Sequence, residues 1–372
     1  MDAPSDTRQT ITRLTPLAAL WAALDAQVKP IAPRNVTLDA AGGCVLAEDV
    51  VPPRYPRSAL ALLDGWALAA DDTVGAGGYS PALLPALPQR VEVGQAVPSG
   101  TDCVAPFDAV RIAGGRAEVL TTINPGDGVL PAGGDCDGTT SLRHAGERLR
   151  AIDRAVLAAA GVATVSVREP RIALLPVRAH DIIEAAARLI ARDIARRGGA
   201  AEFDDARDFG AALTAEGADA VVAIGGTGQG QDDISVRTLS RQGSVLAHGI
   251  ALSPGETAAF GFAGTKPVLL LPGRLDAALA VWLVLGRRML ARLSAHHHDS
   301  EPGETLPLAR KVASTVGVAE LVPVRRADGR VEPLGTTYLS FAALARSDGW
   351  MLVPAESEGY SAGSPVQVRP WP

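Results

Sequence analysis

The feature that most constrains the fold is a run of apolar residues that leads directly into a glycine-rich turn and then a helix. Residues 220–224 have the length and composition of a strand that is buried on both faces. The glycines that follow are Gly225, Gly226, Gly228 and Gly230. Glycine lets the backbone take positive φ and approach a ligand closely. The sequence therefore predicts a strand, a tight turn and a helix in succession.

This segment has two interpretations, an anion site and a plain structural turn. Unpaired N–H groups at the start of the following helix would face a phosphate or a similar anion. Asp232 or Asp233 can cap that helix through its carboxylate. The segment lacks both common nucleotide fingerprints, because it has neither the G-x-G-x-x-G spacing with a downstream acid nor the Gly-Lys-Ser/Thr of a P-loop. Taken alone, it favours neither interpretation.

Composition narrows the class of protein. With 372 residues the chain is long enough for about two to four domains. We expect a cytoplasmic protein with no membrane partner, because no apolar run reaches a membrane span and the first residues do not resemble a secretory signal. The net charge is −6, without a basic stripe, and 4% of residues are aromatic, which argues against nucleic-acid binding. Cys44, Cys103 and Cys136 are too far apart for a C-x-x-C metal site, so we expect packing residues.

The first half of the chain reads as a helix followed by β structure. Residues 14–28 show helical apolar spacing. Residues 52–138 are rich in Gly, Pro and short β-type runs, and they predict a small all-β domain. A helix over residues 151–160 should end at Gly161, before a strand over residues 162–167.

From residue 171 onward, strands alternate with helices. The predicted strands are 171–177, 220–224 and 266–271, and the predicted helices are 183–197, 208–216 and 275–293. Such alternation implies a parallel, doubly wound sheet, which binds ligands at the carboxyl ends of its strands. The turn at Pro272, Gly273 and Arg274 should lie on the same rim as the glycine-rich turn. We therefore expect two loops to converge on one crevice.

These patterns predict a chain of four parts. Residues 1–52 and 139–170 form an N-terminal linking domain of helix and strand, and residues 53–138 form an inserted β domain. Residues 171–295 form the α/β domain, and residues 306–372 form a C-terminal β domain. A polar linker carries His296, His297 and His298. Three adjacent histidines cannot all face one ion, so the linker favours a solvated hinge over a metal site.

Short blocks spread along the chain resemble one known family. They are Val45-Leu-Ala-Glu-Asp-Val-Val-Pro-Pro-Arg, Leu63-Asp-Gly-Trp-Ala-Leu, Val97-Pro-Ser-Gly-Thr-Asp-Cys-Val, Leu157-Ala-Ala-Ala-Gly-Val, Arg168-Glu-Pro-Arg-Ile-Ala-Leu-Leu, Leu271-Pro-Gly-Arg and Leu344-Ala-Arg-Ser-Asp-Gly-Trp-Met-Leu-Val-Pro. In this order they resemble the molybdopterin molybdenumtransferase family, of the MoeA and gephyrin E-domain type. The resemblance covers about residues 14–370.

The resemblance implies a MoeA-like α/β multidomain fold whose doubly wound domain is MogA-like. It also implies a homodimer, with the catalytic cleft between the α/β domain of one subunit and the inserted β domain of the other. The implied reaction is insertion of molybdate into molybdopterin, with adenylylated molybdopterin as substrate, Mg²⁺ as metal and release of AMP. Molybdate and phosphate are both tetrahedral oxyanions, which suits a glycine-rich anion site.

Departures from the family pattern fall where the family does its chemistry. Its Asp-Asn-Ser-Ala-Met-Asp-Gly-Tyr stands here as residues 59–66, in which Asp64 and its glycine remain, and its Met-Thr-Gly-Ala stands as residues 92–95. Its functional glutamate falls on His180, or on Asp181 with a shift of one residue. The two lysines of its Lys-Pro-Gly-Lys-Pro are Ser253 and Glu256. Losing a cation beside an oxyanion weakens binding by about 1–4 kcal/mol per close contact.

The resemblance implies the following site residues. The candidate catalytic residues are Asp64, Asp233 and His180, and the first two are also candidate metal ligands. The candidate cofactor-binding residues are Gly225, Gly226, Thr227, Gly228, Gly230, Ser253, Pro272, Gly273 and Arg274. Arg274 replaces a family asparagine and would restore one cation, and Arg178 is a second candidate grip for an oxyanion.

Each candidate also has a structural interpretation. Asp64 can be a turn aspartate, Asp233 a helix cap and His180 a satisfied structural histidine. Two functions fit these residues. One is a divergent molybdenum-insertion enzyme. The other is a catalytically impaired relative that binds molybdopterin cofactor, delivers it to a molybdoenzyme client or another biosynthesis protein, or serves as a scaffold.

Overall fold

The computed structural model describes residues 9–178, 180–203, 208–296 and 303–372. The chain divides into two compact units. The larger unit comprises Met1–Glu48, Ala145–Ala151 and Ser166–Pro372, and the smaller comprises Asp49–His144 and Ile152–Val165. The expected division into four domains stays a prediction.

The larger unit is built on a six-stranded sheet with the strand order β13, β12, β14, β18, β17, β15. In that order the strands are Ala200–Phe203, Arg171–Pro176, Ala220–Ile224, Lys266–Leu271, Ala259–Ala263 and Ser244–His248. The first four are parallel, β17 pairs antiparallel with β18, and β15 pairs antiparallel with β17. The predicted α/β fold, with a parallel sheet at its centre, is confirmed.

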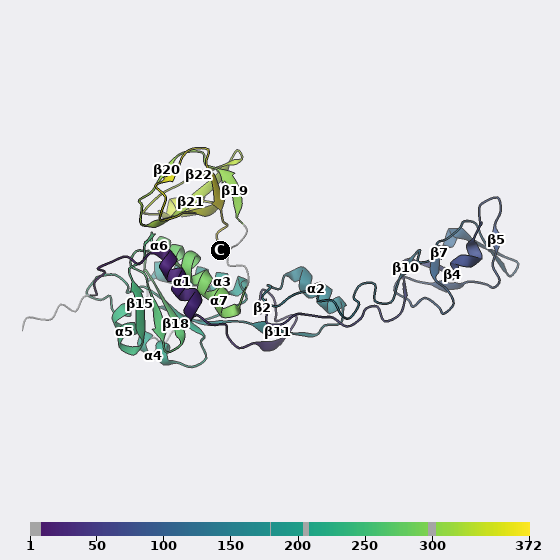
Figure 1. The fold of residues 1–372 in the computed structure, drawn as a ribbon, viewed down its shortest axis with the longest axis horizontal. Helices are drawn as coiled ribbons and strands as arrows, with labels where there is room; N and C mark the ends of the chain where they lie inside the picture. Colours follow the sequence, from purple (N-terminus) through teal and green to yellow (C-terminus); the bar gives the residue numbers. More distant parts are fainter. Residues whose placement is uncertain (1–8, 179, 204–207, 297–302) are drawn as a thin grey trace, which may run out of the picture. The chain divides into compact units, whose positions relative to one another are not determined.

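Helices cover both faces of this sheet (Figure 1). One face is covered by α1, α3, α6 and α7, which are Leu17–Gln27, Asp181–Arg196, Leu275–Val281 and Arg287–Ser294. The other face is covered by α4, Phe209–Thr214, and α5, Ser235–Gln242. Successive strand residues point to opposite faces. Along β14, Val222 and Ile224 pack on the first face, whereas Val221 and Ala223 pack on the second, so the unbroken apolar run serves both cores.

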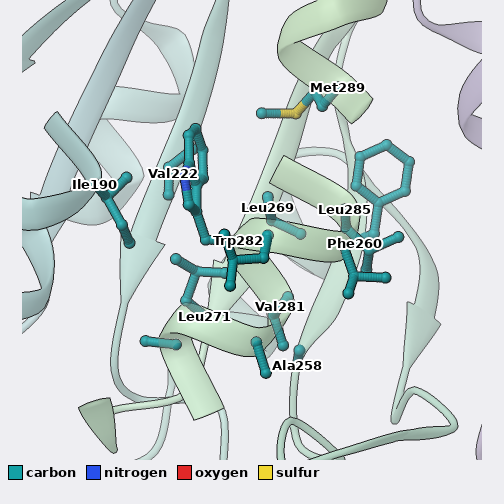
Figure 2. Packing of buried hydrophobic residues seen from close by; sticks show 14 of the residues in the cluster. Ile190, Val222, Ala258, Phe260, Leu269, Leu271, Val281, Trp282, Leu285 and Met289 are labelled. Carbon is teal, nitrogen blue, oxygen red and sulfur yellow. The ribbon is translucent and has the colours of Figure 1, made fainter. Parts of the chain in front are cut away.

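Trp282 anchors the first of these cores. A π-helical turn, η3 (Trp282–Gly286), joins α6 to α7, and the indole packs among Ile190 and Val222 (Figure 2). The indole N–H donates to Asp193 Oδ2 at 2.7 Å, and Arg287 donates to both oxygens of the same carboxylate, at 2.8 and 2.9 Å. Burial opposes ionisation of Asp193, but the hydrogen bond and the charge of Arg287 outweigh it and hold the pKa of Asp193 below its ordinary value.

The C-terminal part of the larger unit is rich in strands, as predicted. Strand β21 (Ala319–Ala327) pairs with β16 (Leu252–Ser253), β22 (Arg330–Pro333) and β23 (Gly349–Val353). Two further pairs join β19 (Glu304–Pro307) to β25 (Pro365–Val368) and β20 (Val312–Ala313) to β24 (Gly359–Tyr360), and α8 spans Phe341–Arg346. Because β16 ends at Ser253, its pairing with β21 fixes where the loop of residues 253–257 begins.

The smaller unit is mostly β structure. Its strands are β3 (Leu60–Ala61), β4 (Gly65–Leu68), β5 (Ala82–Leu83), β6 (Gln89–Val91), β7 (Cys103–Pro106), β8 (Val110–Ala113), β9 (Arg116–Val119) and β10 (Val129–Leu130). Two short 3-10 turns, η1 (Ala70–Thr73) and η2 (Phe107–Ala109), lie between strands. This agrees with the prediction of a β-rich segment without a regular α-helix over residues 52–138.

One further helix and three further strands complete the described elements. They are β1 (Arg34–Thr37), β2 (Val45–Leu46), α2 (Ala151–Ala159) and β11 (Thr164–Arg168). Strands β1 and β2 belong to the larger unit, α2 belongs to the smaller unit from its second residue on, and β11 is divided between the two. Gly161 has φ of +83° just beyond α2, as its predicted role at the helix end requires. Among the described residues, no helix has both the length and the apolarity needed to cross a bilayer.

Candidate functional site

The carboxyl ends of β14 and β18 meet at one edge of the sheet. The Gly225 N–H donates to the Leu271 carbonyl at 2.8 Å, and a Cβ built on Gly273 would lie 3.7 Å from the Gly225 Cα. The glycine-rich loop and the turn at residues 272–274 are therefore in contact. The structure brings these two sequence-predicted loops together.

The chain order opens a crevice at the same edge. The loop after β12 enters α3 on one face of the sheet, and the loop after β14 enters α5 on the other. When the connections after two neighbouring parallel strands run to opposite faces of the sheet, a crevice forms at the carboxyl ends of those strands. A cavity of about 130 Å³ lies there, and Val177, Ile234 and Ser235 are among the residues that line it.

A third loop, residues 253–257, joins this edge. Ser253, at the end of β16, is buried. The Thr257 hydroxyl lies 3.2 Å from the hydroxyl of Thr227. Glu256 turns back along the chain, and its Oε2 accepts the Gly255 N–H at 3.0 Å. Residues 253–257 and residues 272–274 thus both lie beside the glycine-rich loop.

Four successive carbonyl groups of the glycine-rich loop accept hydrogen bonds from protein donors. Ser235 Oγ donates to the Gly225 carbonyl at 3.0 Å, and the Ser235 N–H donates to the Gly226 carbonyl at 3.1 Å. His248 Nε2 lies 3.0 Å from the Thr227 carbonyl, and because a carbonyl only accepts, Nε2 carries the proton.

The remaining donor to this loop is the side-chain amide of Gln9. It donates to the carbonyls of Gly226 and Gly228, at 2.9 and 2.8 Å. Each carbonyl from Gly225 to Gly228 is therefore fixed by at least one donor of the surrounding protein.

The orientation of these carbonyls determines where the loop N–H groups point. In a planar trans peptide the C=O and N–H point in opposite directions. The N–H groups of Gly226, Thr227, Gly228 and Gln229 therefore point away from the donors that hold the carbonyls. We call these four N–H groups the cradle. Within the described part of the chain they donate no hydrogen bond.

The cradle has the properties of an anion site. A run of backbone N–H groups in a turn forms a concave site for an anion, and an unpaired N–H in a buried segment costs about as much as a lost hydrogen bond. Gly226 and Thr227 are buried. Gly226 has φ of +70°, and a Cβ there would clash with Ser235 Oγ, so only glycine allows this arrangement.

The expectation for the start of α5 is wrong in two respects. Helix α5 begins at Ser235 after Ile234, and no side chain of Asp232 or Asp233 caps it. The N–H groups of Val236 and Arg237 donate to Gln9 Oε1, at 3.2 and 3.4 Å. The helix start is thus capped by a residue distant in sequence, and the free donors belong to the loop.

Asp233 closes the far end of the loop. Its Oδ2 accepts the Gly230 N–H at 2.9 Å, and its Oδ1 lies 3.7 Å from Arg178 on the loop after β12. Among the described residues, no three His, Cys, Asp or Glu side chains converge in a way that could hold a metal ion. An acceptor engaged by a backbone N–H and facing an arginine does not by itself fit magnesium, so the Mg²⁺ expected at Asp64 and Asp233 stays a prediction.

Arg274 lies beside the loop with its charge already partnered. Its Nε donates to Asp276 Oδ1 at 3.1 Å, and its guanidinium stacks 4.9 Å from the ring centre of Tyr338. The hydrogen bond to Asp276 raises the pKa of the guanidinium above its ordinary value. Asp276 is buried and also accepts the Leu339 N–H at 3.1 Å. Arg274 is half exposed, so it can still face an anion, with its charge partly offset.

Three family models match the chain in succession. The MoeA N-terminal region (domain I and II) matches residues 15–161, and a probable molybdopterin-binding domain matches residues 178–292. The MoeA C-terminal region (domain IV) matches residues 305–371. The chain belongs to the MoeA family.

Named relatives of this MoeA-family chain span nearly its whole length. A putative molybdopterin biosynthesis protein of Methanocaldococcus jannaschii is 26% identical over 364 residues, which cover 87% of this chain and 88% of the relative. Molybdopterin molybdenumtransferase 2 of Mycobacterium tuberculosis is 24% identical over 390 residues, which cover 90% and 94%.

A solved structure has the same fold. The molybdopterin biosynthesis MoeA protein of Pyrococcus horikoshii matches with a TM-score of 0.77 at 24% identity. The match covers 97% of this chain and 100% of that chain. At this identity the likeness shows the fold alone.

In the smaller unit, hydrogen bonds join two segments at MoeA-family positions. Asp64 is exposed, and its Oδ1 accepts the Val93 N–H at 2.8 Å. Two further hydrogen bonds, from Gly94 N–H to the Ala61 carbonyl and from Ala61 N–H to the Gln95 carbonyl, complete the turn. The structure thus joins residues 59–66 to residues 92–95, two segments in which the sequence departs from the family pattern.

The remaining candidates of this MoeA-family chain lie at the start of α3, after β18 and in the linker that follows α7. His180 is the N-cap of α3, and its Nδ1 accepts the Ile182 N–H at 3.2 Å. Asp181 is the first residue of that helix and is exposed. Pro272 is buried at the end of β18. His296 ends the described linker, and His297 and His298 lie outside the described residues.

Proposed function

We propose that this chain acts in molybdenum cofactor biosynthesis and that the cradle binds the anionic part of molybdopterin or of adenylylated molybdopterin. The observation that carries the proposal is the set of four fixed carbonyls, which leaves four successive N–H groups without an acceptor among the described residues. Membership in the MoeA family supports the choice of ligand.

A phosphate group suits these donors chemically. Charge-assisted hydrogen bonds from N–H groups to an anion are shorter and stronger than neutral ones. The donors are preorganised, because Gln9, Ser235 and His248 hold the loop without a ligand. The same chemistry suits molybdate, the second substrate of the proposed reaction, in which molybdate is inserted into the dithiolene and AMP is released. No step of this proposal uses a metal ion bound by this chain.

A second function is favoured by the charges around the loop. Glu256 stands where the family pattern has a lysine, and it lies close enough to Arg274 to raise the pKa of that guanidinium. Asp276 and Asp233 add two more carboxylates at this edge. Such a site would hold a dianionic substrate less firmly than one with two lysines. Binding and delivery of molybdopterin cofactor, without turnover, is therefore the alternative.

The proposed assembly follows the family as well. We infer a cytoplasmic homodimer in which Asp64 and its turn from one subunit complete the site of the other. A molybdoenzyme client, or another protein of cofactor biosynthesis, would be the partner under the alternative.

Release of AMP separates the two functions. The purified full-length protein is incubated with adenylylated molybdopterin, magnesium and molybdate, and AMP is measured by chromatography. Molybdenum insertion predicts AMP in proportion to cofactor formed, whereas a binding protein predicts retained ligand and no AMP. Gly226→Ala should weaken either behaviour or lower the stability of the protein, and Gly335→Ala is the control because nothing lies within 3.5 Å of a Cβ built there. Absence of both AMP and bound ligand with the wild-type protein would overturn the proposal.

A further inference from the structure

The side chain of Gln9 makes four hydrogen bonds at the candidate site, although it is distant from the glycine-rich loop in sequence. It is 5% exposed. Its Nε2 donates to the carbonyls of Gly226 and Gly228, and its Oε1 accepts the N–H groups of Val236 and Arg237. One amide therefore links the two ends of the segment that runs from the cradle into α5.

We propose that Gln9 is a positioning residue for the cradle. Its two donated hydrogen bonds fix the peptide that carries the Gln229 N–H and, together with the Ser235 N–H, the peptide that carries the Thr227 N–H. The N–H of Gly228, between them, is fixed by His248. A positioning residue of this kind acts through the loop and does not itself touch the anion. This inference rests on the proposed function of the cradle.

The chemistry of the contact selects an amide. The side chain must donate two hydrogen bonds and accept two, and only Asn and Gln have both capacities in one group. An ionised glutamate of the same length accepts only, and it would face two carbonyl oxygens. A protonated glutamate regains one donor. The anion affinity of the cradle should therefore depend on whether residue 9 carries an amide, a protonated carboxyl group or an ionised carboxylate.

The backbone near Gln9 is held against the same part of the sheet. The Thr15 N–H donates to the Gly249 carbonyl, and the Ala251 N–H donates to the Thr15 carbonyl, both at 2.9 Å. A Cβ built on Gly249 would meet Ile11 Cγ2. Residues 9–15 thus run beside residues 248–251, and this segment supplies Gln9 while its neighbour supplies His248. The packing of residues 9–15 beside residues 248–251 therefore affects the conformation of the cradle, because Gln9 and His248 both bond to the loop that carries it.

The coupling can be measured with sulfate, a tetrahedral oxyanion whose charge stays constant between about pH 5 and pH 8. Binding is followed through the amide resonances of residues 226–229 in the full-length protein. Gln9→Ala should weaken sulfate binding at these amides by about tenfold, because the carbonyl of Gly228 loses its donor and the carbonyl of Gly226 keeps only the Ser235 N–H. Gln27→Ala, an exposed glutamine at the end of α1, is the control and should bind like wild type.

Gln9→Glu keeps the test decisive where Gln9→Ala fails to fold. At about pH 8 the ionised variant should bind sulfate more weakly than wild type. At about pH 5 burial keeps the carboxyl protonated, and the affinity should recover to within about threefold of wild type. It should then exceed that of Gln9→Ala at the same pH, because one donated bond returns.

The outcomes separate this inference from the proposed function. If wild type binds sulfate at residues 226–229 and both Gln9 variants bind equally well at each pH, the positioning role is wrong and the cradle stands. Recovery of Gln9→Glu only to the level of Gln9→Ala would show a mere charge effect and would also overturn the positioning role. Failure of wild type itself to shift these amides would remove the cradle, and the inference with it.

Discussion

Replacing Gly226 by alanine should damage both the loop and its ligand affinity. Gly226 has φ of +70°, and a left-handed conformation costs a residue with a Cβ about 1–2 kcal/mol. The new Cβ would clash with Ser235 Oγ, which now donates to the Gly225 carbonyl at 3.0 Å. Loss of that hydrogen bond adds about 1 kcal/mol. The total is therefore about 2–3 kcal/mol.

This cost is divided between two measurable quantities. If the loop keeps its conformation, urea denaturation shows the loss as a lower free energy of unfolding. If the loop relaxes, the first N–H groups of the cradle turn away and the dissociation constant of the anion rises. If the full cost of about 2–3 kcal/mol appears in binding, this rise is roughly 30- to 150-fold. The two losses together should reach about 2–3 kcal/mol, whereas Gly335→Ala should change each by no more than about 0.5 kcal/mol. A Gly226→Ala protein that matches wild type in both assays would refute the reasoning.

Three further predictions concern other groups. Asp193→Asn should lower the free energy of unfolding by about 3–5 kcal/mol, because Arg287 loses its buried carboxylate partner. Since the folded-state pKa of Asp193 is lowered, the wild-type protein should lose this contribution as the pH falls below 3.8. In urea denaturation, the free energy of unfolding of the variant should therefore fall less steeply with acid than that of wild type. Glu256→Gln removes a charge near Arg274, so calorimetry at low salt should show severalfold tighter phosphate binding; unchanged affinity would contradict the charge argument. Burial raises the pKa of Cys103 to about 11, so iodoacetamide at about pH 8 should modify it only after unfolding, and rapid modification of the native protein would be the contrary result.

Local signals in the sequence were sufficient for much of the fold. The apolar run at residues 220–224 and the glycines after it predicted β14 and its turn. Buried strands require apolar residues and positive-φ turns favour glycine, so both elements can be recognised from the local sequence. The same holds for α3 and for the end of α2 at Gly161. That the two loops would meet also followed, since parallel strands end at one edge.

What the sequence did not predict depends on contacts between distant residues. Gln9 caps α5 across a separation of 227 residues, and an exposed-type residue near the start of a chain carries no local sign of this. Asp232 or Asp233 was a candidate helix cap, but the helix begins later and Asp233 bonds backward to Gly230. The antiparallel strands β15 and β17 were also missed, since their short mixed runs lack a clear period.

Charge compensation was equally hidden. Arg274 was expected to supply a free cation, and no pattern in Arg274-Leu-Asp276 states that the aspartate folds back onto the arginine. The partner of a long side chain depends on rotamers and on the nearby C-terminal domain, where Tyr338 and Leu339 complete the arrangement.

Hydrogen exchange at the cradle tests the central claim most directly. The full-length protein is exchanged with and without molybdopterin, and the amides of residues 226–229 are compared with those of β14. If the four loop N–H groups hold the ligand's phosphate, the ligand should slow exchange at these positions and leave β14 nearly unchanged. Saturating ligand that slows exchange elsewhere, and leaves residues 226–229 as fast as in the free protein, would contradict the account.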